Sequence, residues 1–167
     1  MKRQYIIVTV AVFTEFLLHE LAHKFTAQRY GCWSEYRYTE WGLILTLITG
    51  FFGYVFAAPG VVWHSGEITM EEEGKISAAG PATNLALAAI FFAILFSFPL
   101  TGIIGLLLWF VAWINVWVGA FNLVPIPPLD GSKIWKWSIP IYIGMWIAFI
   151  AIGLGLNWDI VKTWFGL

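Results

Sequence analysis

Residues 5–28 read YIIVTVAVFTEFLLHELAHKFTAQ, a run long and apolar enough for a membrane-spanning helix, yet five of its side chains are acidic or basic. Spanning the hydrocarbon core takes about 20 apolar residues, and charged groups there are costly unless they serve a function. Residues 19–23 spell H-E-x-x-H. Positions i and i+4 of a helix share one face, so the imidazoles of His19 and His23 can bind one zinc ion with Glu20 beside it.

The composition indicates an integral membrane protein. Of the 167 residues, 60% are hydrophobic and 11% are charged, whereas a soluble domain carries about 25% charged residues. The net charge of −1 gives no basis for nucleic-acid binding, and the single cysteine, Cys32, excludes an internal disulfide. The apolar run that follows Met1, Lys2 and Arg3 lacks a small-residue cleavage site, so we expect it to remain as part of the first helix.

Four segments are expected to span the membrane, over about residues 5–28, 76–98, 102–123 and 138–156. A fifth span over Trp41–Trp63 is the alternative, since this stretch is uncharged and long enough. Its glycines, proline and β-branched and aromatic residues favour short strands within about residues 31–66. The expected fold is therefore mainly α: a polytopic membrane protein with about four transmembrane helices and a small membrane-associated β-sheet, forming a single core over residues 1–167.

A third zinc ligand is predicted in the segment NLVPIPPLDG, residues 122–131. A catalytic zinc ion has three protein ligands and one open position for water, and Asp130 can complete such a set with the two histidines. The prolines break the helix and free backbone groups close to the metal. A structural turn with an incidental aspartate is the simpler alternative. The rival ligand is His64, the only other histidine, whose surroundings favour a surface position at a strand end.

The shared metal site indicates the number of membrane spans, and the basic residues indicate the orientation of the chain. Asp130 can meet His23 only if the first and third helices run in the same direction, which four spans allow and five do not. Lysine and arginine are enriched on the cytoplasmic side of membrane proteins. Six basic residues lie on the active-site side and three on the other: Lys24, Arg29, Arg37, Lys75, Lys133 and Lys136 against Lys2, Arg3 and Lys162. This distribution predicts an active site near the cytoplasmic side and termini outside.

Three motifs together resemble the site-2 proteases, intramembrane zinc metalloproteases that cut transmembrane helices in regulated intramembrane proteolysis. They are HELAH in the first helix, the segment Gly80-Pro-Ala-Thr-Asn84 in the second, and NLVPIPPLDG after the third. The resemblance covers almost the whole chain. It implies one Zn²⁺ per chain, with these roles: His19, His23 and Asp130 as ligands and Glu20 as the catalytic acid/base.

The resemblance also implies that Asn122, Pro125 and Pro127, which match the family pattern N-x-x-P-x-P-x-L-D-G, bind or unwind the substrate. The Gly42–Trp63 region would match the membrane-associated sheet of the family, which would present an edge strand to the substrate. Relatives often carry a PDZ or CBS regulatory domain. No such domain is expected in this sequence, which resembles a minimal catalytic core.

Further polar side chains in the predicted helices are candidates for supporting roles. Glu15 lies one turn before His19, where it could orient a ligand or face a water path. Asn84 and Asn115 could compensate for backbone groups that a substrate helix exposes when it unwinds. Packing or hydrogen bonding between helices is the commoner role of an asparagine in a membrane.

We therefore expect a zinc endopeptidase that hydrolyses peptide bonds within or near transmembrane helices. Zinc would polarise the scissile carbonyl and acidify a water molecule, and Glu20 would pass a proton from that water to the leaving nitrogen. The expected partners are a transmembrane-helix protein substrate and the lipid bilayer, and the oligomeric state is left open. The alternative is a non-proteolytic zinc-binding membrane protein of the same fold. A zinc channel is disfavoured, because the other helices lack a second pathway of acidic or histidine sites.

Overall fold

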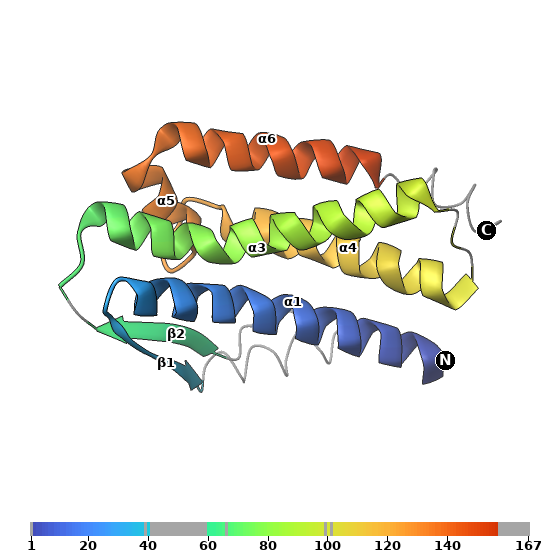
Figure 1. Cartoon of the computed structure of the whole chain (residues 1–167), viewed down its shortest axis with the longest axis horizontal. Helices are drawn as coiled ribbons and strands as arrows, with labels where there is room; N and C mark the ends of the chain where they lie inside the picture. Colours follow the sequence, from blue (N-terminus) through green and yellow to red (C-terminus); the bar gives the residue numbers. More distant parts are fainter. Residues whose placement is uncertain are drawn as a thin grey trace.

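The computed structural model describes residues 2–38, 40, 60–65, 67–98, 100 and 102–156. In chain order the elements are α1 (Lys2–Arg29), β1 (Trp33–Tyr38), β2 (Gly60–Ser65), α3 (Met70–Ser97), α4 (Gly102–Asn122), α5 (Gly131–Trp137) and α6 (Ile139–Gly155). The long helices α1, α3, α4 and α6 lie side by side, and both strands contact α1 (Figure 1).

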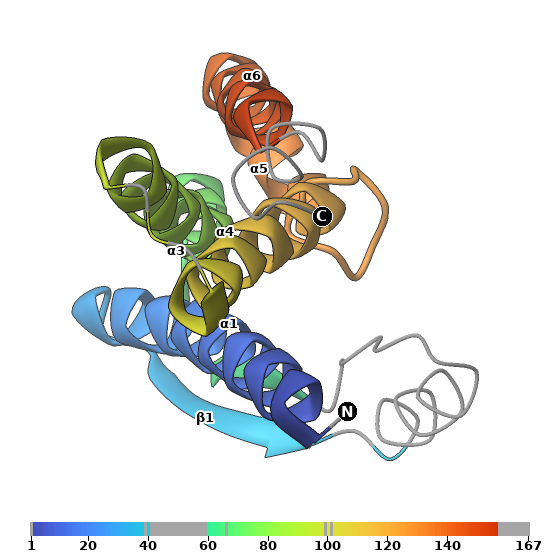
Figure 2. The same ribbon diagram turned by 90° about the vertical axis from the view of Figure 1, so that its right-hand side faces the viewer.

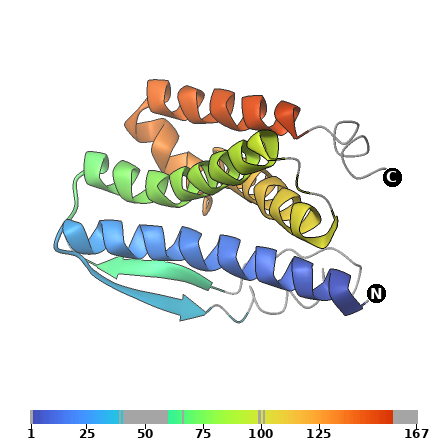
Figure 3. The same cartoon turned by 45° about the vertical axis from the view of Figure 1, so that its right-hand side comes forward.

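Helices α3 and α4 lie in the middle, with α1 and α6 on opposite sides of this pair (Figure 2). Helices α1 and α4 run in one direction, and α3 and α6 run in the other (Figures 1 and 3). The C-terminal ends of α1 and α4 therefore lie at the same end of the molecule as the beginning of α3. Residues from these three helices can meet there although they are far apart in the sequence.

The prediction of a mainly helical membrane protein is confirmed. Among the described residues, α3 and α4 are both long and apolar enough to cross a membrane. Helix α1 has 28 residues but carries several charges, and α6 is an apolar helix of 17 residues. The number of spans beyond α3 and α4 stays a prediction.

The largest difference from the predicted helix boundaries is at the start of α3, which begins at Met70 rather than near residue 76. A capping box explains the earlier start. The hydroxyl of Thr69 accepts a hydrogen bond from the backbone N–H of Glu72 at 3.2 Å, and the Glu72 carboxylate accepts one from the backbone N–H of Thr69 at 2.8 Å. The acidic first turn is helical without being apolar, so a search for membrane spans omits it.

Helix α5 has no counterpart in the sequence-based prediction, because seven residues are too few to show an apolar period. It is tied to the end of α4 through Gly131. A Cβ atom on Gly131 would lie 2.0 Å from the carbonyl oxygen of Leu123. The absence of a side chain therefore allows the chain to fold back over α4 directly after Asp130, and this fold brings Asp130 toward α1.

A two-stranded antiparallel sheet follows α1, with a register that runs from Trp33 opposite Ser65 to Tyr38 opposite Gly60. The hydroxyl of Ser34 in β1 donates a hydrogen bond to the carbonyl of Lys24 at 3.2 Å, which joins the sheet to the C-terminal half of α1. Most of the predicted alternative span, residues 41–59, lies outside the described residues, and residues 60–63 belong to β2. The association of the sheet with the membrane stays a prediction.

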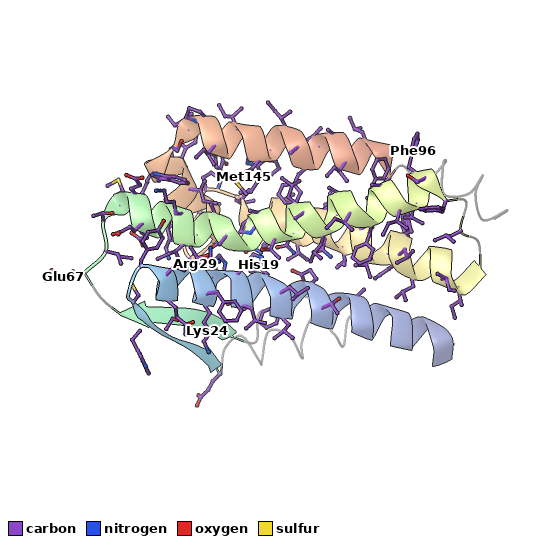
Figure 4. All side chains as sticks on the ribbon, viewed as in Figure 1. His19, Lys24, Arg29, Glu67, Phe96 and Met145 are labelled. Carbon is purple, nitrogen blue, oxygen red and sulfur yellow. The ribbon has the colours of Figure 1, made fainter. Side chains whose placement is uncertain are left out.

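The core lies between α3, α4 and α6. Its buried apolar side chains include Ala88, Leu95, Trp109, Ala112, Val116, Met145 and Phe149. The three helices meet closely at Gly119, where a Cβ atom would lie 2.3 Å from the Phe149 ring and 3.0 Å from the Cβ atom of Asn84. Large apolar side chains also lie on the outer surface, among them Phe96 near the end of α3 (Figure 4). Such an apolar surface suits contact with lipid.

Candidate metal centre

His19 and His23 are one turn apart on α1, and both are buried. Both contact α3, and Figure 4 shows His19 between the two helices. Their Nε2 atoms are 3.0 Å apart. The Nδ1 atom of His23 is 2.7 Å from the carbonyl oxygen of Ile76, and the Nδ1 atom of His19 contacts the amide oxygen of Asn84. Since these oxygens only accept hydrogen bonds, each Nδ1 donates its proton and each Nε2 keeps a lone pair for a metal ion.

Asp130 approaches the two histidines from the loop between α4 and α5. Its Oδ2 atom lies 3.3 Å from Nε2 of His19 and 3.2 Å from Nε2 of His23. Desolvation by burial raises the pKa of this carboxyl, but without a metal ion the protonated imidazoles of His23 and His19 outweigh it and hold the pKa below its usual range. A zinc ion would take the place of the Nε2 protons as the positive charge beside the carboxylate. Asp130 is therefore ionised and suited to bind a cation.

The three donor atoms form a triangle with sides of 3.0, 3.2 and 3.3 Å. Ligand atoms about 2.0–2.1 Å from a tetrahedral zinc ion lie about 3.3 Å from one another, so the triangle matches one face of such a tetrahedron. Imidazole nitrogen and carboxylate oxygen are also donor types that zinc binds in proteins. The set of His19, His23 and Asp130, which lies close enough to share one ion, therefore fits zinc with a fourth position open.

A cavity of about 630 Å³ joins these ligands to the surface. Glu15 and His19 line its deep part, while exposed side chains such as Met70 and Lys136 line its outer part. Glu73 and Lys133 also line the cavity and form an ion pair of 3.7 Å between α3 and α5. Water can therefore reach the metal-binding atoms from the end of the molecule where α3 begins.

The other predicted catalytic and substrate-binding residues lie around this cavity with one exception. Glu20 is partly buried and lines it next to His19. Asn122 and Pro127 also line it, and the amide of Asn122 donates a hydrogen bond to the carbonyl of Val118 at 3.1 Å. Pro125 is exposed and is not among the lining residues of the described part of the chain.

The three polar residues predicted to have supporting roles are joined to one another behind His19. Asn84 donates hydrogen bonds from its amide nitrogen to Glu15 Oε1 at 3.2 Å and to Asn115 Oδ1 at 2.9 Å. Asn115 in turn donates to the carbonyl of Val111 at 2.8 Å. The rival ligand His64 lies in β2, where its backbone pairs with Ser34.

Two contributors to the site were missed in the sequence. The first is the backbone carbonyl of Ile76, which holds His23 and which no residue type reveals. The second is Gly80, where a Cβ atom would lie 2.3 Å from Nε2 of His23 and 2.6 Å from Nε2 of His19. A signal for Gly80 was present, because it stands one helical turn before Asn84 in the recognised motif and so shares its face.

Two buried histidines, a carboxylate and an adjacent glutamate surround a cavity that water can enter, on a scaffold with two helices apolar enough to span a membrane. This combination defines a membrane-embedded metallohydrolase.

Comparison with known proteins agrees with this class. The model of peptidase family M50 matches residues 99–148. The protein MJ0611 of Methanocaldococcus jannaschii, provisionally named a zinc metalloprotease, is 43% identical over 136 residues, which cover 80% of this chain and 71% of that relative. The chain therefore belongs to peptidase family M50, the site-2 proteases.

Two further relatives carry the same provisional name of zinc metalloprotease. YwhC of Bacillus subtilis is 33% identical over 156 residues, covering 81% of this chain and 69% of YwhC. Rip3 of Mycobacterium tuberculosis is 35% identical over 130 residues, covering 75% of this chain but 29% of Rip3. No solved structure matches the chain.

The position of Gly80 leads to a test of the metal centre. We expect Gly80→Ala to weaken zinc binding at least ~10-fold, because forcing a methyl group into a packed site typically costs about 1–3 kcal/mol and this one points at both Nε2 atoms. Chelator competition on the purified protein measures the affinity. Gly144→Ala on α6 is the control, since a Cβ atom there meets nothing within 4 Å. Equal zinc affinity of both variants would contradict the geometry of the site.

Proposed function

We propose that this protein is an intramembrane zinc metalloprotease, an endopeptidase that hydrolyses peptide bonds within or near the transmembrane helices of membrane proteins. The observation that carries the proposal is the triangle of His19, His23 and Asp130 with Glu20 beside it, in a cavity open to water. Membership of peptidase family M50 and relatives named as zinc metalloproteases support the same conclusion. The described helices form one catalytic core in this proposal.

In this proposal His19, His23 and Asp130 hold one zinc ion per chain. When bound, zinc supplies Lewis-acid chemistry, polarising the scissile carbonyl and lowering the pKa of water in the fourth position. The donation of both Nδ1 protons to oxygen atoms keeps the two Nε2 lone pairs directed at the ion. Gly80 leaves room for the ion, because a Cβ atom at this position would lie 2.3 Å from Nε2 of His23 and 2.6 Å from Nε2 of His19.

Glu20 is the catalytic acid/base. Its place next to His19 and on the cavity wall puts its carboxylate beside the path by which water enters. It takes a proton from the attacking water and delivers it to the nitrogen of the departing amine. The cavity supplies the water that an apolar surrounding would otherwise exclude.

Asn122, Pro125 and Pro127 bind the substrate. A helical substrate hides its carbonyls in i→i−4 hydrogen bonds, so a short stretch has to unwind before attack. The freed backbone groups need partners in an apolar environment. Asn122 offers an amide at the cavity wall, and Pro127 lines the cavity from the loop that carries Asp130. Pro125 is included because it matches the family pattern, although it lies on the exposed side of the loop.

The proposed membrane topology is supported by the arrangement of the helices and the distribution of charge. We propose that α1, α3, α4 and α6 all span the membrane, with the active site near the cytoplasmic side and the termini outside. The parallel course of α1 and α4 supports this, and so does the larger number of basic residues at the end where the cavity opens.

The catalytic role of Glu20 is tested by Glu20→Gln, with Glu67→Gln at an exposed position as the control. We expect Glu20→Gln to lower the cleavage rate of a helix-destabilised transmembrane substrate by about 10²–10⁴-fold or more, since general acid–base catalysis contributes that much. Zinc content should stay near one ion per chain, because the ligands remain. Unchanged cleavage by Glu20→Gln would contradict the mechanism. A zinc-loaded wild-type protein that cleaves no such substrate would instead favour the non-proteolytic alternative.

The orientation is tested by cysteine labelling in a Cys32→Ser background. We expect a membrane-impermeant maleimide to label Lys136→Cys in inverted vesicles, where the cytoplasmic face is exposed, and not in intact cells. Lys2→Cys lies at the N-terminal end of α1, far from the cavity. It should be labelled in intact cells and not in inverted vesicles. Labelling of Lys136→Cys from outside the cell would refute the proposed orientation.

A further inference from the structure

Behind His19, away from the metal-binding face, lies a chain of amide groups that crosses three helices. It runs from His19 on α1 through Asn84 on α3 to Asn115 on α4 and ends at a backbone carbonyl of α4. Asn84 and Asn115 are both 0% exposed, so water does not replace any of these contacts. We propose that Asn84 and Asn115 are positioning residues that fix which ring nitrogen of His19 is offered to zinc.

The direction of every hydrogen bond in the chain follows from its far end. The carbonyl of Val111 can only accept, so the group of Asn115 that faces it, at 2.8 Å, is the NH₂. This leaves Asn115 Oδ1 facing Asn84, where it accepts a hydrogen bond at 2.9 Å. Asn84 must therefore present its own NH₂ to Asn115. Its Oδ1 then faces His19, which has to donate from Nδ1.

Glu15 stabilises the same orientation of the Asn84 amide through a second hydrogen bond. Its Oε1 accepts from the NH₂ of Asn84 at 3.2 Å, so both hydrogens of that amide are used. Rotating the Asn84 amide by half a turn would place its oxygen against the oxygens of Asn115 and Glu15. The same rotation would make His19 an acceptor at Nδ1 and put the proton on Nε2, where it blocks metal binding.

The two zinc-binding histidines are thus fixed in different ways. His23 donates from Nδ1 directly to the backbone carbonyl of Ile76, which cannot rotate. His19 instead donates to the side chain of Asn84, which can rotate. The chain of hydrogen bonds from Asn84 through Asn115, called the relay below, ends on a backbone carbonyl that cannot rotate. The affinity of the site for zinc therefore depends on Asn115. Among the described contacts, this residue has none with His19, His23 or Asp130. This inference rests on His19 being a zinc ligand, as proposed above.

The test uses the full chain in detergent and measures zinc affinity by chelator competition. Asn84→Leu removes the acceptor for His19 without a large change in volume, and we expect ~10–100-fold weaker binding, the usual effect of losing a group that orients a metal ligand. Asn115→Leu should weaken binding by a smaller factor, because Glu15 still orients the Asn84 amide. Thr83→Val is the matched control: it removes a hydroxyl on the same helix that donates a hydrogen bond to the carbonyl of Ala79, and it should bind zinc as the wild type does.

A compensating variant distinguishes the loss of the acceptor for His19 from a defect in packing. Asn84→Asp combined with Glu15→Gln and Asn115→Leu restores an oxygen acceptor for His19 and a donor–acceptor pair between positions 15 and 84, without changing the net charge. Asn115→Leu is included because its amide oxygen would otherwise face the new carboxylate. We expect this triple variant to bind zinc at least ~10-fold more tightly than Asn84→Leu. In the zinc-loaded wild type, nuclear magnetic resonance should also show a hydrogen-bonded Nδ1 proton of His19 that exchanges slowly with water. This proton should exchange faster in Asn115→Leu.

Three results would overturn the proposal: zinc affinity of Asn84→Leu within about twofold of the wild type, a loss in Thr83→Val equal to that in Asn84→Leu, or a triple variant no tighter than Asn84→Leu. If Asn84→Leu does not fold, the zinc affinities of Asn115→Leu and the triple variant, each compared with the wild type, decide the question. The outcome is separable from the protease assignment. A protein that shows this pattern of zinc affinity but cleaves nothing would contradict the protease activity and still support the relay.

Discussion

The site depends on one constraint: three donor atoms from two distant segments must lie about 3 Å apart inside an apolar protein. His19 and His23 meet this condition locally, because one helical turn separates them. Asp130 meets it only because α4 runs in the same direction as α1 and the chain then folds back over the end of α4. Gly131 permits that fold, since any side chain there would collide with the Leu123 carbonyl.

A second requirement is that the polar groups needed for the reaction must be stabilised where little water is available. An unpaired buried polar group costs free energy, and the buried side chains of Glu15, Asn84 and Asn115 near the ligands are hydrogen-bonded to one another. Asn84 is the centre of this arrangement, because it contacts α1 and α4 from its place on α3. Its own position is made possible by Gly119, whose missing side chain lets α4 approach Asn84 and Phe149 closely. The close contact between Gly119 and Asn84 therefore affects both the packing of the helices and the orientation of His19.

Local patterns carried most of what the sequence could predict. The HELAH pentapeptide and the segment NLVPIPPLDG identified three residues that the structure brings together. These signals succeed because spacing along a helix or turn fixes which side chains can meet. Length and hydropathy likewise predicted the helical fold, with boundaries that agree within a few residues apart from the start of α3.

What the sequence could not predict depends on contacts between elements. The carbonyl of Ile76 has the same chemistry as any other, and its role comes only from lying opposite His23. Helix α5 is too short for a periodic signal, and the exposed position of Pro125 depends on how the loop folds. The amide chain through Asn115 is of the same kind, because its direction is set by a backbone carbonyl on a different helix.

The central claim is that one zinc ion is bound by two imidazoles and one carboxylate, with a fourth position left for water. X-ray absorption spectroscopy of the zinc-loaded protein tests it most directly, since it reports the number and type of atoms around the metal. The account predicts four nitrogen and oxygen neighbours at about 2.0–2.1 Å, two of them with the scattering pattern of imidazole, and loss of one imidazole in His19→Ala. A sulfur neighbour at about 2.3 Å, or a spectrum that His19→Ala leaves unchanged, would contradict it.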